Sequence, residues 1–404
     1  MTEQFEFSDK AKRITLLLML VGVLSIAYGF ISGHGERTWA NLLVCSYYFT
    51  CICLAGLFFV ALQYVAQAGW ATGLVRIPEA FMSVLPFASA VIVIVVASGL
   101  LTHNLYHHWA DPALLNEFMA DGKTPNPEYD KIIAGKSAFL NVPFFIGRLV
   151  FFVIIWNIFA RLFRKLSLNQ DQSSSLDNYQ KSFKYGAIFL VIFAFTSAIF
   201  AFDIMMSIEA HWFSTMFAWY NFASMWVSGL AGIALTTIIL KENGYLSHVN
   251  ENHLHDLGKF VFAFSIFWAY VWVSQFILIW YANLPEEVTW FYYRWKPEYI
   301  YLFWGNVVIN FLVPFLVLMS RDAKRNMKTL KIVCIIVLLG HWLDFYMMAM
   351  PGSVGAERGL DIPEFGILIG FVGLFSYMMM RSLSKAPLVV KNHPFLQESL
   401  HHHI

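Results

Sequence analysis

Charged residues are scarce in this sequence. Asp, Glu, Lys and Arg make up only 13% of its 404 residues, against about 25% in an average soluble domain, while 58% are hydrophobic and the mean hydropathy is +0.59. The stretches between apolar runs are also short, the longest being 102–137. These shortages exclude a large extramembrane catalytic domain and indicate a polytopic membrane protein. A net charge of +1 gives no reason to expect a nucleic-acid partner.

Cysteine is nearly absent, and its few copies fall in apolar runs. The four are Cys45, Cys51, Cys53 and Cys334, and no CxxC or CxxCH spacing occurs. Disulfides, zinc, iron–sulfur ligation and covalent haem attachment are therefore poorly supported. We expect these thiols to be small core residues and predict no metal site in this chain.

Histidine is available but badly placed for haem. A haem b held by two imidazoles needs axial ligands on facing spans, and of the 13 histidines only His341 lies well inside an apolar run. We therefore expect any redox centre to belong to a partner chain.

Ten apolar runs are long enough to cross a hydrocarbon core of about 30 Å. We predict an all-α integral membrane protein with these spans and a tail at 382–404: 14–32, 39–66, 79–101, 139–163, 185–207, 212–240, 258–283, 298–320, 331–350 and 365–381.

The basic residues are distributed unequally between the two ends of these spans. Nineteen of the 27 Lys and Arg lie on the side of the N-terminus, seven lie on the other side, and Arg148 lies within a span. Because positive loops stay in the cytoplasm, we expect both termini to be cytoplasmic. The 203–212 turn and the 102–137 loop then face outward.

An internal repeat suggests how the spans are grouped. When Trp39 is placed on Trp212, seven of 24 positions are identical: the Trp pair, Tyr47/Tyr220, Phe49/Phe222, Gly56/Gly229, Leu57/Leu230, Ala61/Ala234 and Leu62/Leu235. Both segments run inward, so the repeat is parallel. We predict two four-helix bundles, 39–207 and 212–350, with the first and last helices outside them; coincidence between aromatic-rich helices is the alternative.

A turn between the fifth and sixth spans carries three titratable groups, Asp203, Glu209 and His211. Ionisable side chains so close to hydrocarbon often mark a proton or substrate route. For Glu209 and His211, a polar turn that caps a helix is the competing explanation.

Four ionisable residues lie deeper in the predicted spans. We expect Arg148 to pair with Asp203 in the first bundle, and His341 with Asp344 in the second, because His341 and Asp344 are spaced i, i+3 on one helix face. The pairs serve either proton transfer or helix–helix packing. Asn306 and Asn310, four residues apart, are expected to share a polar, hydrogen-bonded face.

One stretch resembles a known signature. DIMMSIEAHWFST (203–215) is similar to the DWIMSLEPHWFST motif of the F-type membrane subunit of bacterial alternative complex III, a quinol:cytochrome c oxidoreductase. The chain departs from it at Ile204 and Ala210, where Trp and Pro are expected. Further similar stretches are KSAFLN (136–141) leading to Arg148, GHWLD (340–344) and ESLHHH (398–403).

This resemblance covers essentially the whole chain. It implies a place in the bacterial inner membrane and the fold of the polysulfide-reductase/nitrite-reductase membrane-anchor group, two four-helix bundles plus extra helices. It implies a subunit that is not catalytic alone and that offers a remnant of a quinone site or a proton route. Menaquinone or ubiquinone is the implied ligand, with no residues assigned to it. The implied partners are a paralogous membrane subunit, a periplasmic iron–sulfur subunit, c-type cytochrome subunits, a terminal oxidase and lipids; haem and iron–sulfur clusters belong to those partners.

Two classes of function remain after these arguments. The first is the respiratory subunit just described, including a version whose quinone pocket is closed. The second is a secondary transporter with a proton-coupled site between two parallel bundles.

Overall fold

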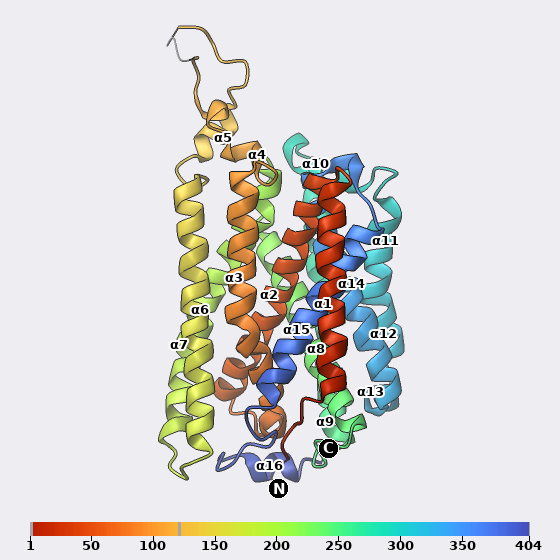
Figure 1. Ribbon diagram of the computed structural model, residues 1–404. Coiled ribbons are helices and arrows are strands. Elements are labelled where there is room, and N and C mark those ends of the chain that lie inside the picture. Colours follow the sequence, from red (N-terminus) through yellow and green to blue (C-terminus); the bar gives the residue numbers. More distant parts are fainter. Residues whose placement is uncertain (1–2, 120–122, 404) are drawn as a thin grey trace.

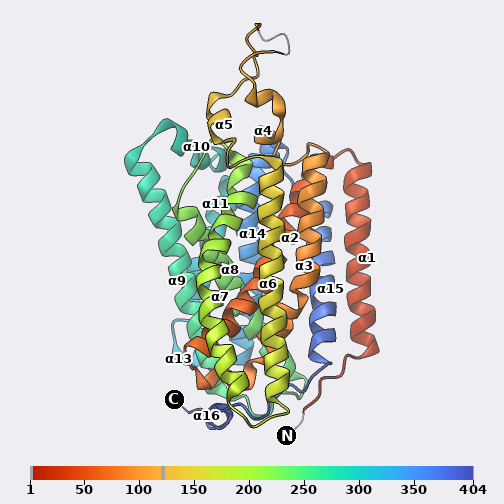
Figure 2. The same ribbon diagram turned by 90° about the vertical axis from the view of Figure 1, so that its left-hand side faces the viewer.

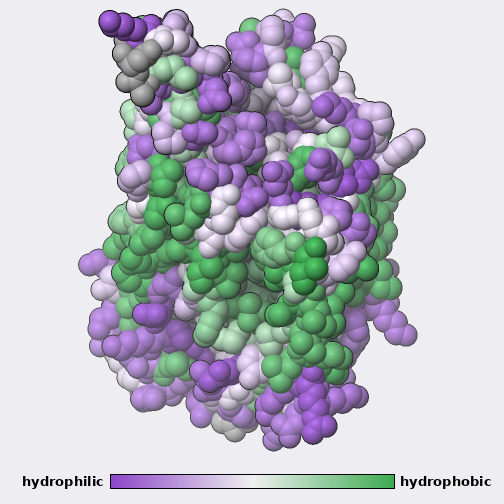
Figure 3. Space-filling view, turned by 45° about the horizontal axis from the view of Figure 1, so that its top comes forward, coloured by the Kyte–Doolittle hydropathy of each residue, from purple (hydrophilic) through white to green (hydrophobic). Residues whose placement is uncertain are grey.

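Helices run along almost the whole chain in the computed structural model, which describes residues 3–119 and 123–403. In this described part, ten spans are long and apolar enough to cross a membrane (Figure 1). They are α1 (Asp9–Ile31), α2 (Gly35–Val65), α3 (Arg76–Leu101), α6 (Val142–Gln170), α7 (Asp177–Ile204), α8 (Met216–Glu242), α9 (Glu251–Ala282), the interrupted span Ile300–Val317, α14 (Met327–Ser353) and α15 (Ile362–Leu383). A hydrophobic band lies between two hydrophilic ends on the face drawn in Figure 3. The chain is an all-α, multi-pass membrane protein.

Several helices extend beyond the predicted apolar runs. α6 ends at Gln170 rather than 163, and α7 and α9 begin several residues early. Polar first and last turns continue a helix past the hydrocarbon, because local caps satisfy the end amides there. Asn250, for example, caps α9 through the amides of Asn252 and His253.

The eighth span is not one continuous α-helix. It consists of α11 (Ile300–Val307), a π-helical turn η4 (Val308–Leu312) and α12 (Val313–Val317). Pro314 has no N–H to donate to the carbonyl of Asn310, which accounts for the local widening.

Two four-helix bundles follow from the helix contacts. In the first, α2 packs on α3 and α7, and α6 closes the ring between them; in the second, α8 packs on α9 and α14, and the eighth span closes the ring. The same cyclic order in both bundles agrees with the parallel repeat. The two equivalent helices α2 and α8 form the centre, where a Cβ on Gly229 would lie 2.1 Å from that of Ala55.

α1 and α15 pack together at the periphery, and α15 also contacts α2 and α3. Glycines allow this pairing: a Cβ on Gly22 would lie 2.5 Å from the Cα of Gly370, and Gly366 faces Ser25. Such small-residue contacts bring membrane helices close enough for van der Waals packing and Cα–H···O contacts.

Both labelled chain ends lie at one end of the bundles, here called the terminal side (Figure 1). The opposite, distal side carries the short helices α4 (His107–Ala110), α5 (Lys131–Lys136) and α10 (Pro285–Arg294). On the terminal side the tail runs beneath both bundles, and its helix α16 (Leu396–Leu400) packs on η1 (Gly69–Leu74).

Candidate functional site

The expected pair of the first bundle is present. Arg148 on α6 donates from Nε and Nη2 to the two carboxylate oxygens of Asp203 on α7, at 2.8 and 2.9 Å. Its Nη1 donates to the carbonyl of Phe139, and the rings of Phe139 and Phe144 lie 3.9 and 4.1 Å from the guanidinium carbon. Such a closed, bidentate pair fixes α6 against α7.

Asp344 of α14 is held differently. Its two oxygens accept hydrogen bonds from neutral donors on three other helices: the hydroxyls of Tyr220 and Ser224 on α8, the indole Nε1 of Trp268 on α9 at 2.9 Å, and Nδ2 of Asn306 on α11 at 2.6 Å. Donors of this kind stabilise a carboxylate without a cation beside it.

The expected hydrogen bond between His341 and Asp344 does not form. Nδ1 of His341 lies 3.7 Å from Oδ2 of Asp344, beyond hydrogen-bond distance, because the carboxylate is already occupied by its other donors. The side chains of His341 and Asp344 are fully buried. Neither Nδ1 nor Nε2 of His341 has a hydrogen-bond partner among the described residues. A shift of about 1 Å would bring the ring into hydrogen-bond distance of the carboxylate.

The asparagine pair extends this cluster. Nδ2 of Asn310 donates to Oδ1 of Asn306 at 2.6 Å and to the carbonyl of Gly340 at 2.9 Å. Asn310 lies in the π-helical turn, a feature that often occurs at functional sites. We call the set Tyr220, Ser224, Trp268, Asn306, Asn310, His341 and Asp344 the Asp344 cluster.

Glu209 is paired with a residue that the sequence did not single out. Nη2 of Arg294, the last residue of α10, lies 2.7 Å from Oε1 of Glu209. The same guanidinium donates to the carbonyls of Trp290, Met347 and Met348, and it lies 3.6 Å from the Trp290 ring. Arg294 therefore joins Glu209 to the α14 turn that follows Asp344.

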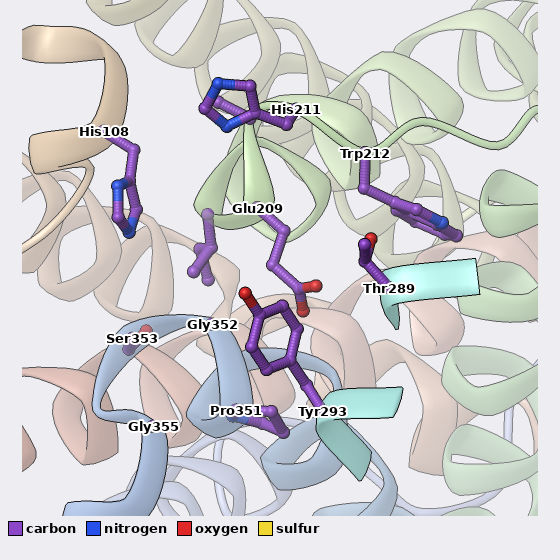
Figure 4. A pocket seen from close by; sticks show the side chains of 12 residues that line it. His108, Glu209, His211, Trp212, Thr289, Tyr293, Pro351, Gly352, Ser353 and Gly355 are labelled. Atoms are coloured by element: carbon purple, nitrogen blue, oxygen red, sulfur yellow. The ribbon is translucent and has the colours of Figure 1, made fainter. Parts of the chain in front are cut away.

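Glu209 also lines a cavity of about 470 Å³ on the distal side. In Figure 4 its carboxylate points into this cavity beside Tyr293 and Thr289 of α10, with His108 on the opposite wall and His211 above. Arg294 and Glu209 therefore link the buried carbonyls of Met347 and Met348 on α14 to this cavity on the distal side.

His211 belongs to the rim of the same cavity. Its Nε2 lies 2.5 Å from Oδ2 of Asp130, and its side chain is half exposed. Burial raises the pKa of Asp130, but the hydrogen bond from His211 and those from the amides of Ile133 and Ile132 outweigh it, so that pKa lies below its ordinary value. This pair closes the loop before α5 onto the 203–212 turn.

Two further buried ion clusters involve residues that the sequence did not single out. Glu79 of α3 binds Arg76 of the same helix and Arg164 of α6. Arg37 on α2 binds Glu364 on α15 at 2.5 Å.

The four cysteines, expected as small core residues, are buried and free of disulfides.

Comparison with known protein families and with curated proteins found no match for this chain. Any assignment of function therefore depends on the residues themselves.

Proposed function

We propose that this chain is the integral membrane subunit of a quinol-oxidising respiratory complex of the alternative complex III type, and that it supplies a proton-transfer route. In this proposal the terminal side faces the bacterial cytoplasm, and the distal helices α4, α5 and α10 offer an anchoring surface to periplasmic redox subunits. Electrons pass through those partners, which hold the haem and iron–sulfur groups. Any contact of this chain with menaquinone or ubiquinone is additional to its role in proton transfer.

The observation that carries the proposal is the position of His341. It is a fully buried imidazole without a hydrogen-bond partner among the described residues, 3.7 Å from a buried carboxylate. A purely structural histidine is usually hydrogen-bonded when buried, whereas a proton carrier needs a nitrogen that can form and break a bond.

A route outward is supported by the groups above the cluster. Asp344 is followed on α14 by the carbonyls of Met347 and Met348, which Arg294 binds, and Arg294 contacts Glu209 at the distal cavity. Protons released on this path would leave toward the proposed periplasmic side. Arg148 and Asp203, being closed on each other, serve as a structural pair in this proposal.

Co-purification tests the partner assignment. Membranes that express the chain with an affinity tag are solubilised in mild detergent, and the captured material is examined for c-type haem absorbance and for iron–sulfur signals in electron paramagnetic resonance. We expect both. A chain isolated without either, which moves a solute into liposomes, contradicts the proposal.

Substitution tests the proton route in the assembled complex. We expect Asp344→Asn and His341→Gln to assemble but to lower quinol:cytochrome c turnover and proton release by at least about tenfold, since positioned proton carriers contribute 10²–10⁴-fold. Thr196→Val is the matched control, because Thr196 is a buried polar residue that binds Trp156 and cannot titrate. Full assembly with unchanged turnover and proton release leaves only a structural role.

The π-helical turn in the eighth span favours the second candidate, a proton-coupled secondary transporter, since interrupted helices line transport sites. The equivalent helix of the first bundle, α6, is continuous over Val142–Gln170, however, so the interruption is not repeated. Solute uptake by liposomes containing the chain alone distinguishes this candidate.

A further inference from the structure

A groove of about 390 Å³ lies between α3 and α6 near the terminal side. These helices are neighbours on the wall seen in Figure 2. Its apolar wall includes Met82, Pro86 and Leu168, and three cations of α6 line it: Arg161, Arg164 and Lys165. None of the roles discussed above uses this groove.

The charge in the groove is only partly compensated. Arg164 is held by Glu79, which is fully buried and also binds Arg76. Arg161 and Lys165 are exposed and form no hydrogen bond or ion pair with any other described residue. Their i, i+4 spacing places them on one face of α6, so two unpaired positive charges lie beside an apolar surface.

The position of the groove fits the headgroup layer of a bilayer. At about 1.5 Å per residue the 29 residues of α6 span about 43 Å, more than the hydrocarbon core of about 30 Å, so its last turns extend into the polar layer. Phe87, next to Pro86 on α3, is 49% exposed, as expected of an apolar side chain that faces acyl chains. The groove thus has its cations at headgroup depth and an apolar wall toward the acyl chains.

From this geometry we propose that the groove between α3 and α6 binds one anionic phospholipid, with the phosphate between Arg161 and Lys165 and an acyl chain against Met82, Pro86 and Leu168. Basic pockets between membrane helices recognise anionic headgroups by charge, and an apolar wall adds contact with an acyl chain, which a free anion lacks. The site does not depend on the proposed respiratory function.

Lipid binding is measured by native mass spectrometry on the delipidated full chain in detergent, with added phosphatidylglycerol, phosphatidylcholine or inorganic phosphate. We expect phosphatidylglycerol to bind with clear preference over phosphatidylcholine. The double substitution Arg161→Gln/Lys165→Gln should weaken phosphatidylglycerol binding by roughly tenfold or more.

Arg381→Gln/Lys385→Gln is the matched control. It removes two exposed cations with the same spacing in sequence outside the groove, Arg381 in the last turn of α15 and Lys385 two residues past its end. It should leave binding within twofold of wild type. Leu168→Trp keeps the charge but fills the apolar part of the groove, and it should also weaken binding.

Three results would overturn the proposal. The first is phosphatidylglycerol binding that survives Arg161→Gln/Lys165→Gln or is lost equally in the control. The second is unchanged binding in Leu168→Trp, which would show charge attraction alone. The third is displacement of the lipid by an equal concentration of inorganic phosphate, which would make the site one for a free anion.

Discussion

Arg148 and Asp203 share two hydrogen bonds of 2.8 and 2.9 Å between α6 and α7, and each side chain is almost completely buried. Asp344, three residues after His341 in the other bundle, binds four neutral donors instead. The Asp203 carboxylate is paired with a permanent positive charge, whereas the Asp344 carboxylate is held only by dipoles, so removal of the Asp203 carboxylate leaves a buried cation without its partner.

We predict that Asp203→Asn destabilises the protein by about 3–5 kcal/mol, because it leaves the Arg148 guanidinium buried without its counter-ion. Thermal unfolding in detergent measures the effect. The double substitution Asp203→Asn/Arg148→Met should recover part of the loss, since removing both charges is far less costly than removing one. A single variant as stable as wild type would show that Arg148 finds another partner.

We predict that Asn306→Leu lowers the free energy of unfolding by about 1–3 kcal/mol, because it removes one donor from Asp344 and the acceptor of Asn310. Chemical or thermal unfolding of the purified chain measures this loss. As a control, Val308→Leu changes an exposed neighbour of the same span and should have little effect. Equal stability of the two variants would contradict a structural role for the asparagine pair.

Gly370→Leu should separate α1 from α15, since even a Cβ at this position would lie 2.6 Å from the Cα of Gly22. We expect faster proteolysis of the segment around α1 and loss of cysteine cross-links introduced between the two helices. Substitution of the exposed Val372 by Leu on the same helix is the control and should preserve both. Unchanged cross-linking in Gly370→Leu would show that the helices adjust without losing contact.

Docking of the tail should weaken at acidic pH. Burial against Tyr64 and Tyr179 lowers the pKa of His393 to about 4, with nearby Arg76 lowering it further and Glu79 opposing. The docked state therefore favours neutral His393: docking is complete above the ordinary pKa of 6.5 and weakens as the pH falls from there toward 4.

Hydrogen exchange of residues 391–400 checks this prediction. After correction for intrinsic rates, we expect exchange to be faster at about pH 5 than at about pH 7.5. His393→Phe keeps an aromatic ring but cannot titrate, so its exchange should depend much less on pH. An equal pH dependence in both proteins would assign the effect to other groups.

The sequence was sufficient for the ten spans and for the Arg148–Asp203 pair. Long apolar runs determine the spans, and a buried cation requires a counter-ion, of which the first bundle has few. The seven identities between the segments that begin at Trp39 and Trp212 indicated the two bundles. These features depend on composition and on position along the chain, which a sequence states directly.

The partners of Asp344 and Glu209 could not be found in that way. These partners come from helices α8, α9, α10 and α11. Most of the helices concerned are apolar on every face, so the sequence pattern does not indicate which faces pack together. Arg294 was counted only as a loop cation, because α10 is short and its docking is set by Trp290 and Trp212 packing. The same holds for His341, whose missing hydrogen bond follows from donors that crowd the carboxylate.

The tail beneath the bundles has a mechanical consequence. Gln170 of the first bundle donates a hydrogen bond to the carbonyl of Asn392, and Asp256 of the second is hydrogen-bonded to His402, so one segment of eleven residues is attached to both bundles. A rocking motion of one bundle against the other would have to break these hydrogen bonds. Such an attachment favours a rigid scaffold, and the proposed proton transfer would then depend on the rotation of single side chains rather than on movement of whole bundles.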